Sequence, residues 1–281
     1  MKRYRICQFD FDTRIHPLTM EIKEEWEENI KKLHYENRKN IEEGLVIQYG
    51  ISNANIKKQN FIDLGLKPIS ILAFHNNFFE QIRYSFVVGG YYPALTGACA
   101  LGERILNHLI IKLRDDYKTK PEYKKIYMKN SFDNWELTIE TLKKWSVLLP
   151  EVVKKFKELE EMRHKSIHFR PDVDQNDREL ALRAFHCLQE IIKNQFSGFG
   201  PQPWFITTIP GEIYIKKEWE SNPFIKKIYI PNCLLVGHRH IIKQIIPELI
   251  VEDNFEYPDE EISDEEFSKL RSQKQDVRVV S

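Results

Sequence analysis

Cysteine is scarce in the chain, and the few cysteines form no metal-binding or disulfide pattern. Cys7, Cys99, Cys187 and Cys233 are far apart and include no Cys-x-x-Cys pair. This spacing argues against a disulfide framework and against a cysteine-rich zinc site. We therefore expect free thiols that pack as small hydrophobic side chains.

A long uninterrupted hydrophobic run is also missing. No stretch of about 18 apolar residues occurs, so no membrane-spanning helix is expected. The first residues, MKRYRICQFDFD, lack the apolar segment of a signal peptide. These absences predict a cytoplasmic protein that has no membrane partner.

Net charge is absent as well, but the charges are unevenly distributed. The chain has 42 basic and 42 acidic residues among 281. Nine of the acidic residues and no basic residue lie between positions 252 and 266. The remainder is therefore mildly basic, which suits a polyanionic partner. We expect the acidic segment to be a flexible tail that could cover the basic face.

Hydrophobic periodicity predicts a mainly α fold, α+β when the whole chain is considered. We expect an N-terminal helical extension (1–67), an antiparallel helical bundle (68–196), a small β-rich appendage with a helix (197–251) and the acidic tail (252–281). Helices are predicted at 19–43, 68–88, 91–117, 133–147, 150–168, 177–196 and 240–249. Strands are predicted at 4–11, 204–208, 212–216, 224–231 and 234–236.

The helix predicted at 91–117 is apolar almost all round, as expected for a central helix. Its first half is rich in small residues, so another helix is expected to approach closely there. Glu103 and Arg104 interrupt the apolar surface, either as a surface pair or in a polar role near a functional site. The following segment, 118–129, is rich in lysine and tyrosine. It is interpreted either as a solvated loop or as a surface for single-stranded RNA.

The strongest functional motif lies at the end of the helix predicted at 150–168. Arg163 is a permanent cation suited to phosphate oxygens, and His168 can exchange a proton near neutral pH. Five residues turn through about 140° on an ideal helix. Arg163 and His168 therefore converge only if the last turn loosens or a second copy of the helix faces the first.

Three interpretations of this motif stay open on the residues alone. Its cations could simply complement the negative end of the helix dipole. His164 and His168, at positions i and i+4, share a face and could bind a metal, although no third ligand is evident nearby. Arg163 and His168 could instead form a ribonuclease centre.

Two segments together carry a resemblance to a known family. Residues 92–110 and the motif Arg163-His164-Lys165-Ser166-Ile167-His168 resemble the HEPN superfamily of α-helical bundles, over roughly residues 68–196. The family signature is an arginine, a polar residue, three or more further residues and a histidine. Arg163, His164 and His168 match it position by position.

The resemblance implies a metal-independent endoribonuclease with no cofactor. The RNA 2′-hydroxyl would attack the adjacent phosphate and leave a 2′,3′-cyclic phosphate. The expected catalytic residues are Arg163, His164 and His168, and Lys165 and Arg170 are assigned to substrate binding. A homodimer with paired sites, a toxin or phage-defence setting and a protein partner such as an antitoxin are also implied. The alternative is a non-catalytic HEPN-like module that binds RNA or protein.

Overall fold

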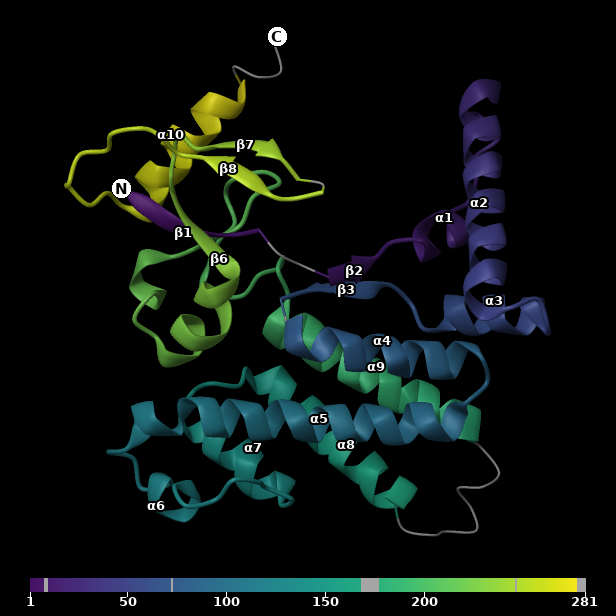
Figure 1. Cartoon of the computed structure of the whole chain (residues 1–281), viewed down its shortest axis with the longest axis horizontal. Coiled ribbons are helices and arrows are strands. Elements are labelled where there is room, and N and C mark those ends of the chain that lie inside the picture. The colour runs from purple at the N-terminus through teal and green to yellow at the C-terminus, as the bar shows by residue number, and fades with distance from the viewer. Residues whose placement is uncertain (8–9, 72, 168–176, 246, 277–281) are drawn as a thin grey trace. The chain divides into compact units, whose positions relative to one another are not determined.

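The computed structural model describes residues 1–7, 10–71, 73–167, 177–245 and 247–276 (Figure 1). It divides the chain into two units, Asp10–Ser197 and the combination of Met1–Phe9 with Gly198–Ser281. We call them the helical unit and the sheet unit. Residues 1–67 thus belong to both units, and the helical unit ends at Ser197, one residue after the predicted end of the bundle.

The described chain is mainly helical and has a small antiparallel sheet, which confirms the coarse α+β prediction. No helix among the described residues has both the length and the apolar composition needed to cross a membrane. The helical unit contains, in chain order, β2 (Asp10–Asp12), α1 (Ile15–Thr19), α2 (Glu28–Tyr49), α3 (Ala54–Asp63), β3 (Lys67–Ser70), α4 (Ala73–Val87), α5 (Tyr91–Leu113), η1 (Arg114–Tyr117), α6 (Tyr123–Ile126), α7 (Trp135–Lys144), α8 (Pro150–Ile167) and α9 (Asp177–Phe196).

Helix α5 is the central helix of this unit. It packs against α4 and α9 on one side and against α7 and α8 on the other (Figure 1). The predicted close approach occurs at Gly102, where an added Cβ would lie 2.7 Å from Leu159 and 2.8 Å from Trp135. Only a residue without a side chain leaves room for both neighbours.

Helix α8 begins where its sequence signal predicts, and α9 begins and ends at the predicted residues. Pro150 opens α8, as expected of proline at a first helical position. The described part of α8 ends at Ile167, and α9 spans the predicted residues. The cap of α7 is Asn134, one residue after the predicted Asp133, and its side chain accepts a hydrogen bond from the Leu137 amide at 2.8 Å.

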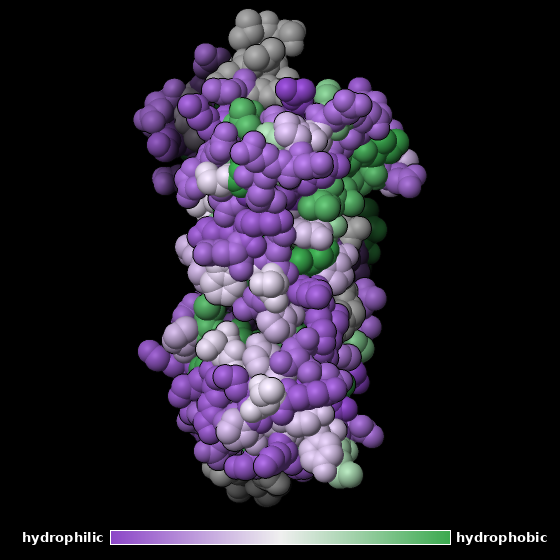
Figure 2. All heavy atoms as spheres, turned by 90° about the vertical axis from the view of Figure 1, so that its left-hand side faces the viewer, coloured by the Kyte–Doolittle hydropathy of each residue, from purple (hydrophilic) through white to green (hydrophobic). Residues whose placement is uncertain are grey.

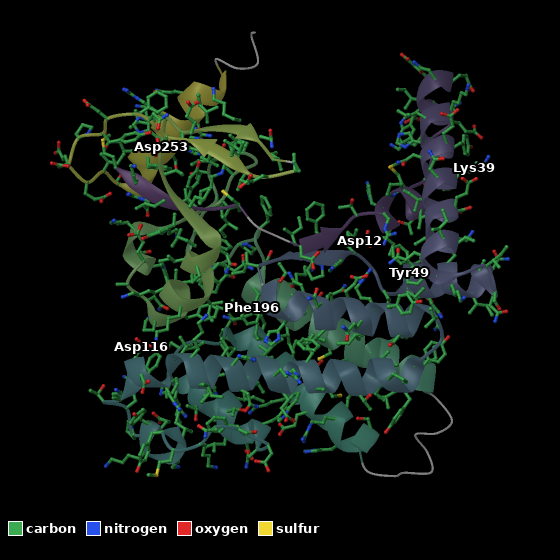
Figure 3. All side chains as sticks on the ribbon, in the orientation of Figure 1. Asp12, Lys39, Tyr49, Asp116, Phe196 and Asp253 are labelled. Atoms are coloured by element: carbon green, nitrogen blue, oxygen red, sulfur yellow. The ribbon has the colours of Figure 1, made fainter. Side chains whose placement is uncertain are left out.

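The first long helix lies later in the chain than predicted. Helix α2 begins at Glu28, because the preceding residues form a turn from which Trp26 packs on the His34 ring at 5.0 Å. A single glycine inside a helix costs about 1 kcal/mol, so Gly44 does not end α2. The helix continues to the buried Tyr49 (Figure 3) and stops at Gly50, whose φ is 82°.

Pro68 does not open a helix, contrary to the prediction. It lies in β3, which pairs antiparallel with β2 through Asp12 and Lys67. Helix α4 begins only at Ala73. Pairing with a strand more than fifty residues earlier determines this conformation. Local periodicity contains no information about so distant a partner.

The sheet unit has a four-stranded antiparallel sheet in the order β4-β5-β1-β6. Its elements are β1 (Lys2–Ile6), β4 (Phe205–Ile206), β5 (Tyr214–Ile215), η2 (Lys217–Trp219), η3 (Ile225–Tyr229), η4 (Ile230–Asn232), β6 (Cys233–Gly237), β7 (Ile241–Gln244), β8 (Ile250–Glu252) and α10 (Asp264–Asp276). The strands predicted at 204–208, 212–216 and 234–236 are present as β4, β5 and β6. The N-terminal strand predicted at 4–11 is present as β1 and β2.

Two predictions in this unit are wrong. The strand predicted at 224–231 is a π-helical turn followed by a 3₁₀ turn, because its buried residues recur at helical intervals. The helix predicted at 240–249 is a hairpin of β7 and β8, in which Ile242 pairs with Val251. Short apolar runs do not distinguish strand from helix without their partners.

The predicted acidic tail forms a helix and ion pairs among the described residues, while its flexibility stays a prediction. Its carboxylates form ion pairs with the first strand: Glu261 and Asp264 lie 2.6 and 2.7 Å from the buried Arg3 guanidinium. Asp253, labelled in Figure 3, accepts a hydrogen bond from the Gly237 amide at 2.9 Å. Helix α10 adds Phe267 to a small core with Tyr214. On the face drawn in Figure 2, most of the surface is hydrophilic and hydrophobic residues gather in separate groups.

Candidate functional site

Arg163, the first residue of the motif, is held by side chains from two other helices. Its Nη2 lies 3.0 Å from Oε2 of Glu103 on α5. The same carboxylate oxygen accepts a hydrogen bond from the Trp135 indole on α7 at 3.1 Å. The Arg163 guanidinium carbon also lies 5.7 Å from the centre of a Trp135 ring. The guanidinium is thus fixed at the meeting point of α5, α7 and α8, with a fifth of the side chain still exposed.

This arrangement lines a cavity of about 600 Å³, which we call the Arg163 cavity. Its volume lies within the range typical of small-molecule sites. Two arginines and one carboxylate contribute charge, so the lining carries a net positive charge. The residues around it are Thr96, Cys99, Ala100, Glu103, Arg104, Asn107, His108, Ile111, Asn130, Ser131 and Arg163.

The polar role considered for Glu103 and Arg104 is supported by their position. Both line the Arg163 cavity, Glu103 as the partner of Arg163 and Arg104 as an exposed cation. The Arg104 guanidinium carbon lies 4.8 Å from the Phe78 ring centre, which is a cation–π distance. An anion entering the cavity would therefore meet two guanidinium groups.

The cavity also contains a histidine that the sequence analysis did not single out. His108 lies one helical turn after Arg104 on α5, and its ring is 5.1 Å from the buried His75 ring. Burial, with the charges of Arg104 and Lys112, lowers the pKa of His108. Burial also lowers the pKa of His75, to about 3, with help from His108 and Arg104. The lowered pKa values favour the neutral form of both rings.

The cavity thiol has no nucleophilic character. Cys99 is buried, and burial raises the pKa of its thiol to about 11. The thiolate is the reactive form of cysteine, so this side chain is unreactive at neutral pH. All four cysteines are free, as predicted from their spacing.

The remaining residues of the motif separate in space. His164 is exposed and is not among the residues lining the Arg163 cavity. Lys165 lines a different cavity of about 300 Å³, together with Arg183 and Cys187. His168 and Arg170 lie outside the described residues. The structure thus brings Arg163 together with residues of α5, and does not bring Lys165 to the same cavity.

The lysine- and tyrosine-rich segment leads to the cavity. Tyr123 and Tyr127 stack at a ring distance of 5.6 Å on α6. Asn130 and Ser131, a few residues further on, line the Arg163 cavity. Arg114 holds the segment by donating to the carbonyl of Lys129 at 2.5 Å. The lysines of this segment therefore precede, in the sequence, the residues that line the cavity.

Metal ligation finds no support among the described side chains. No group of three or more His, Cys, Asp or Glu residues there could hold a metal ion. His240 of the sheet unit is buried, and its Nδ1 bonds to the Gly237 carbonyl at 2.7 Å. The His240 ring therefore stabilises a turn, and this contact gives no indication of a metal ligand.

The sequence signal for His108 was present but weak. Arg104 and His108 stand at i and i+4, so they share a helix face. The apolar character of α5 indicates a core helix whose surface is interrupted at Glu103 and Arg104, and His108 does not stand out from that pattern. No family model, no curated protein and no solved structure matches the chain. The Arg163 cavity and the sequence motif are therefore the features of the chain that point to a function.

Proposed function

We propose that the chain is a metal-independent endoribonuclease of HEPN type. The observation that carries the proposal is the position of Arg163, which Glu103 holds in a positively charged cavity five residues before His168. A guanidinium fixed in a partly buried cavity is suited to stabilising the charge that grows on phosphate oxygens. The substrate is RNA, because the chemistry uses the ribose 2′-hydroxyl as the nucleophile.

The proposed roles follow from the residue types. His168 takes the proton from the 2′-hydroxyl or gives one to the departing 5′-oxygen. Arg163 binds the scissile phosphate, and His164 orients the reacting groups. Lys165 and Arg170 contact the RNA backbone on either side. The products are a 2′,3′-cyclic phosphate and a 5′-hydroxyl.

A second copy of the chain would supply the opposing motif. Arg163 and His168 lie about 140° apart around an ideal helix, so a homodimer offers a way to bring one of each to the same phosphate. We propose this dimer as the active form, in a cytoplasmic toxin or phage-defence setting, with an antitoxin-like partner. Growth arrest after induction of the wild-type chain, absent for His168→Ala, is the expected cellular result.

The direct test is RNA cleavage by the purified chain in excess EDTA. We expect cleavage that Arg163→Ala and His168→Ala each reduce by at least a hundredfold with unchanged circular dichroism. His34→Ala and Lys39→Ala are matched controls, because both residues lie on α2, outside the Arg163 cavity and outside the cavity that Lys165 lines. Activity abolished by EDTA and restored by zinc or manganese would contradict the proposal and favour a metal site at His164 and His168.

One observation favours the alternative, a non-catalytic binding module. Glu103 already occupies one edge of the Arg163 guanidinium, as a purely structural ion pair would. In that case the variants would lower the affinity for RNA or protein and no RNA substrate would be cut. Cleavage and binding measured on the same preparations separate the two functions.

A further inference from the structure

A second cavity adjoins the Arg163 cavity along α5. It has a volume of about 300 Å³ and lies between α4 and α5. Ala100 and Arg104 line both cavities, so the two meet at these residues. We call the combined depression the α5 groove. Both of its walls belong to the helical unit.

The two compartments of the α5 groove differ in chemistry. The Arg163 cavity is polar and carries net positive charge, as described above. The second compartment presents the partly exposed ring of Phe78, the side chain of Gln81 and the apolar surface of Pro93. Arg104 stands at the boundary, with its guanidinium 4.8 Å from the Phe78 ring centre. A cation therefore separates an aromatic compartment from a polar one.

We propose that the α5 groove binds one nucleotide step of single-stranded RNA, with the base in the Phe78 compartment and the adjacent phosphate at Arg104. This inference rests on the proposed function and assigns a subsite to it. A base offers a flat face that stacks on an aromatic ring in any sequence context. The phosphate is the complement of a guanidinium, which presents planar donors to its oxygens.

Arg104 is available for such a contact. Among the described residues, no carboxylate forms an ion pair with it, whereas Arg163 is partly neutralised by Glu103. Charge complementarity therefore favours an anionic occupant over a helix from a second copy, which would leave this cation covered and unpaired.

Gln81 gives the subsite a means of discrimination. Its side-chain amide carries both donors and an acceptor, whereas its neighbours in this compartment are aromatic, aliphatic or hydroxyl-bearing and, at Arg104, cationic. An amide can pair with the edge of one base and leave another unsatisfied. We therefore expect the groove to prefer one base type, with Gln81 as a specificity-determining residue.

The probe is a set of four fluorescein-labelled 2′-O-methyl RNA tetranucleotides, one for each base, measured by fluorescence anisotropy in EDTA. The methyl groups block cleavage, so binding is measured alone. We expect Arg104→Ala to weaken binding of all four strands by tenfold or more. Phe78→Ala should weaken all four by about tenfold, the loss expected for one stacked base. Gln81→Ala should make the affinities for the four strands nearly equal. The affinity for the strand that binds most weakly to the wild type should change by less than threefold.

Matched controls lie on exposed positions of the same unit outside the α5 groove. Lys39→Ala controls for loss of an exposed cation and Tyr35→Ala for loss of an exposed ring. Binding by Arg104→Ala and Phe78→Ala within twofold of wild type would overturn the subsite. A changed sedimentation coefficient with unchanged RNA affinity would also overturn it, because the groove would then be an interface between copies.

The subsite and the nuclease can fail separately. If the strands bind as expected and ordinary RNA is never cut, the ribonuclease proposal fails and the subsite stands. If RNA is cut and the groove variants neither weaken binding nor raise KM, the subsite fails and the nuclease stands.

Discussion

The residue on which the account depends is Arg163, and its partner Glu103 determines how it can act. A guanidinium on a flexible stem loses less conformational freedom on binding when a carboxylate already fixes it. Glu103 itself is held by the Trp135 indole, so the three side chains form one hydrogen-bonded group. Glu103 is therefore a positioning residue in this account, acting through Arg163.

Glu103→Gln tests that role. The amide keeps the size of the side chain and loses the charge that attracts Arg163. We expect kcat for RNA cleavage to fall by about tenfold, because the guanidinium is less well oriented. KM should stay the same or fall, because the cavity gains one unit of net positive charge.

The control is Glu140→Gln, which breaks the 2.9 Å ion pair with Lys157 between α7 and α8 outside the Arg163 cavity. It should leave both constants unchanged. A rise in KM at unchanged kcat in Glu103→Gln would contradict the positioning role.

At this scale the sequence predicted part of the site. Arg163 and Glu103 could be singled out because a charged residue stands out in its context: one ends an amphipathic helix and the other interrupts an apolar one. The signal for His108 is weaker, because an exposed histidine on a long helix gives no sign of what lies across from it. Its neighbours Arg104 and His75 come together only through the packing of α4 on α5.

At the scale of elements, the neighbours of α5 approach it most closely at a position that has no side chain. Gly102 lets Leu159 of α8 and Trp135 of α7 approach the α5 backbone. The same two neighbouring helices carry the groups around Arg163. The packing at Gly102 therefore helps to set the spacing of the functional cavity.

Gly102→Ala should destabilise the helical unit. The added Cβ would lie 2.7 Å from Leu159, and overpacking of this kind costs about 1–3 kcal/mol. A gain in helix propensity of up to about 1 kcal/mol offsets part of the cost. We expect a net loss of about 1–2 kcal/mol in the free energy of unfolding, measured by guanidinium titration.

Gly44→Ala on α2 is the matched control. No heavy atom lies within 4 Å of an added Cβ there. This substitution should stabilise the chain by about 0.5–1 kcal/mol through helix propensity alone. Equal effects of the two substitutions would contradict the close packing at Gly102.

The elements that could be predicted from the sequence are those with long periodic patterns. The helix at 177–196 and the opening of α8 at Pro150 follow from periodicity and proline placement. The segments at 224–231 and 240–249 could not be predicted, because a run of a few apolar residues fits either a strand or a helix. For 240–249, the deciding interaction is pairing with β8, which lies outside the segment.

At the scale of the whole chain, the sheet unit joins the two ends of the described sequence. Strand β1 pairs with β5 and β6, and α10 packs its Phe267 beside Tyr214. A buried charged group lies beneath: Glu212 bonds to Arg271 at 2.6 and 2.7 Å, lies 3.1 Å from Arg5, and accepts from Tyr214. Arg5 also approaches the ring of His240 at 2.5 Å.

This group predicts that acid weakens the sheet unit. Burial lowers the pKa of His240 from 6.5 to about 4, so protonation favours the unfolded chain as pH falls from 6.5. Burial alone would raise the pKa of Glu212, but Arg271, Tyr214 and Arg5 lower it from 4.5 to about 2. Its stabilisation is present above pH 4.5 and is lost as pH falls towards 2.

Calorimetry between pH 7 and pH 3 checks this expectation. The transition whose Tm falls in Arg271→Met is assigned to the sheet unit. In the wild-type chain, the Tm of this transition should fall steadily from pH 7 to pH 3. Glu212→Gln should lower that Tm at pH 7 and flatten the dependence below pH 4.5. A transition whose Tm does not change between pH 7 and pH 4 would contradict the role of His240.

The joining of chain ends could not be predicted from the sequence. Composition marked residues 252–266 as acidic and therefore as a tail, but their cationic partners Arg3 and Lys2 lie some 250 positions earlier. Local patterns carry no information about such distant pairs. The rest of the chain does have more basic than acidic residues. Part of the acidic segment, however, is paired with Lys2 and Arg3 within the sheet unit.

The central claim is that the chain cuts RNA through the ribose 2′-hydroxyl without metal. The most direct measurement uses 2′-O-methyl RNA strands that contain a single unmodified ribose, in four versions with different bases, incubated with the purified chain in EDTA. Mass spectrometry of the products should show one cut, directly after the unmodified ribose, with a 2′,3′-cyclic phosphate that is absent for His168→Ala. Cleavage at a methylated position, or no cleavage of these strands and of ordinary RNA at any concentration, would contradict the account.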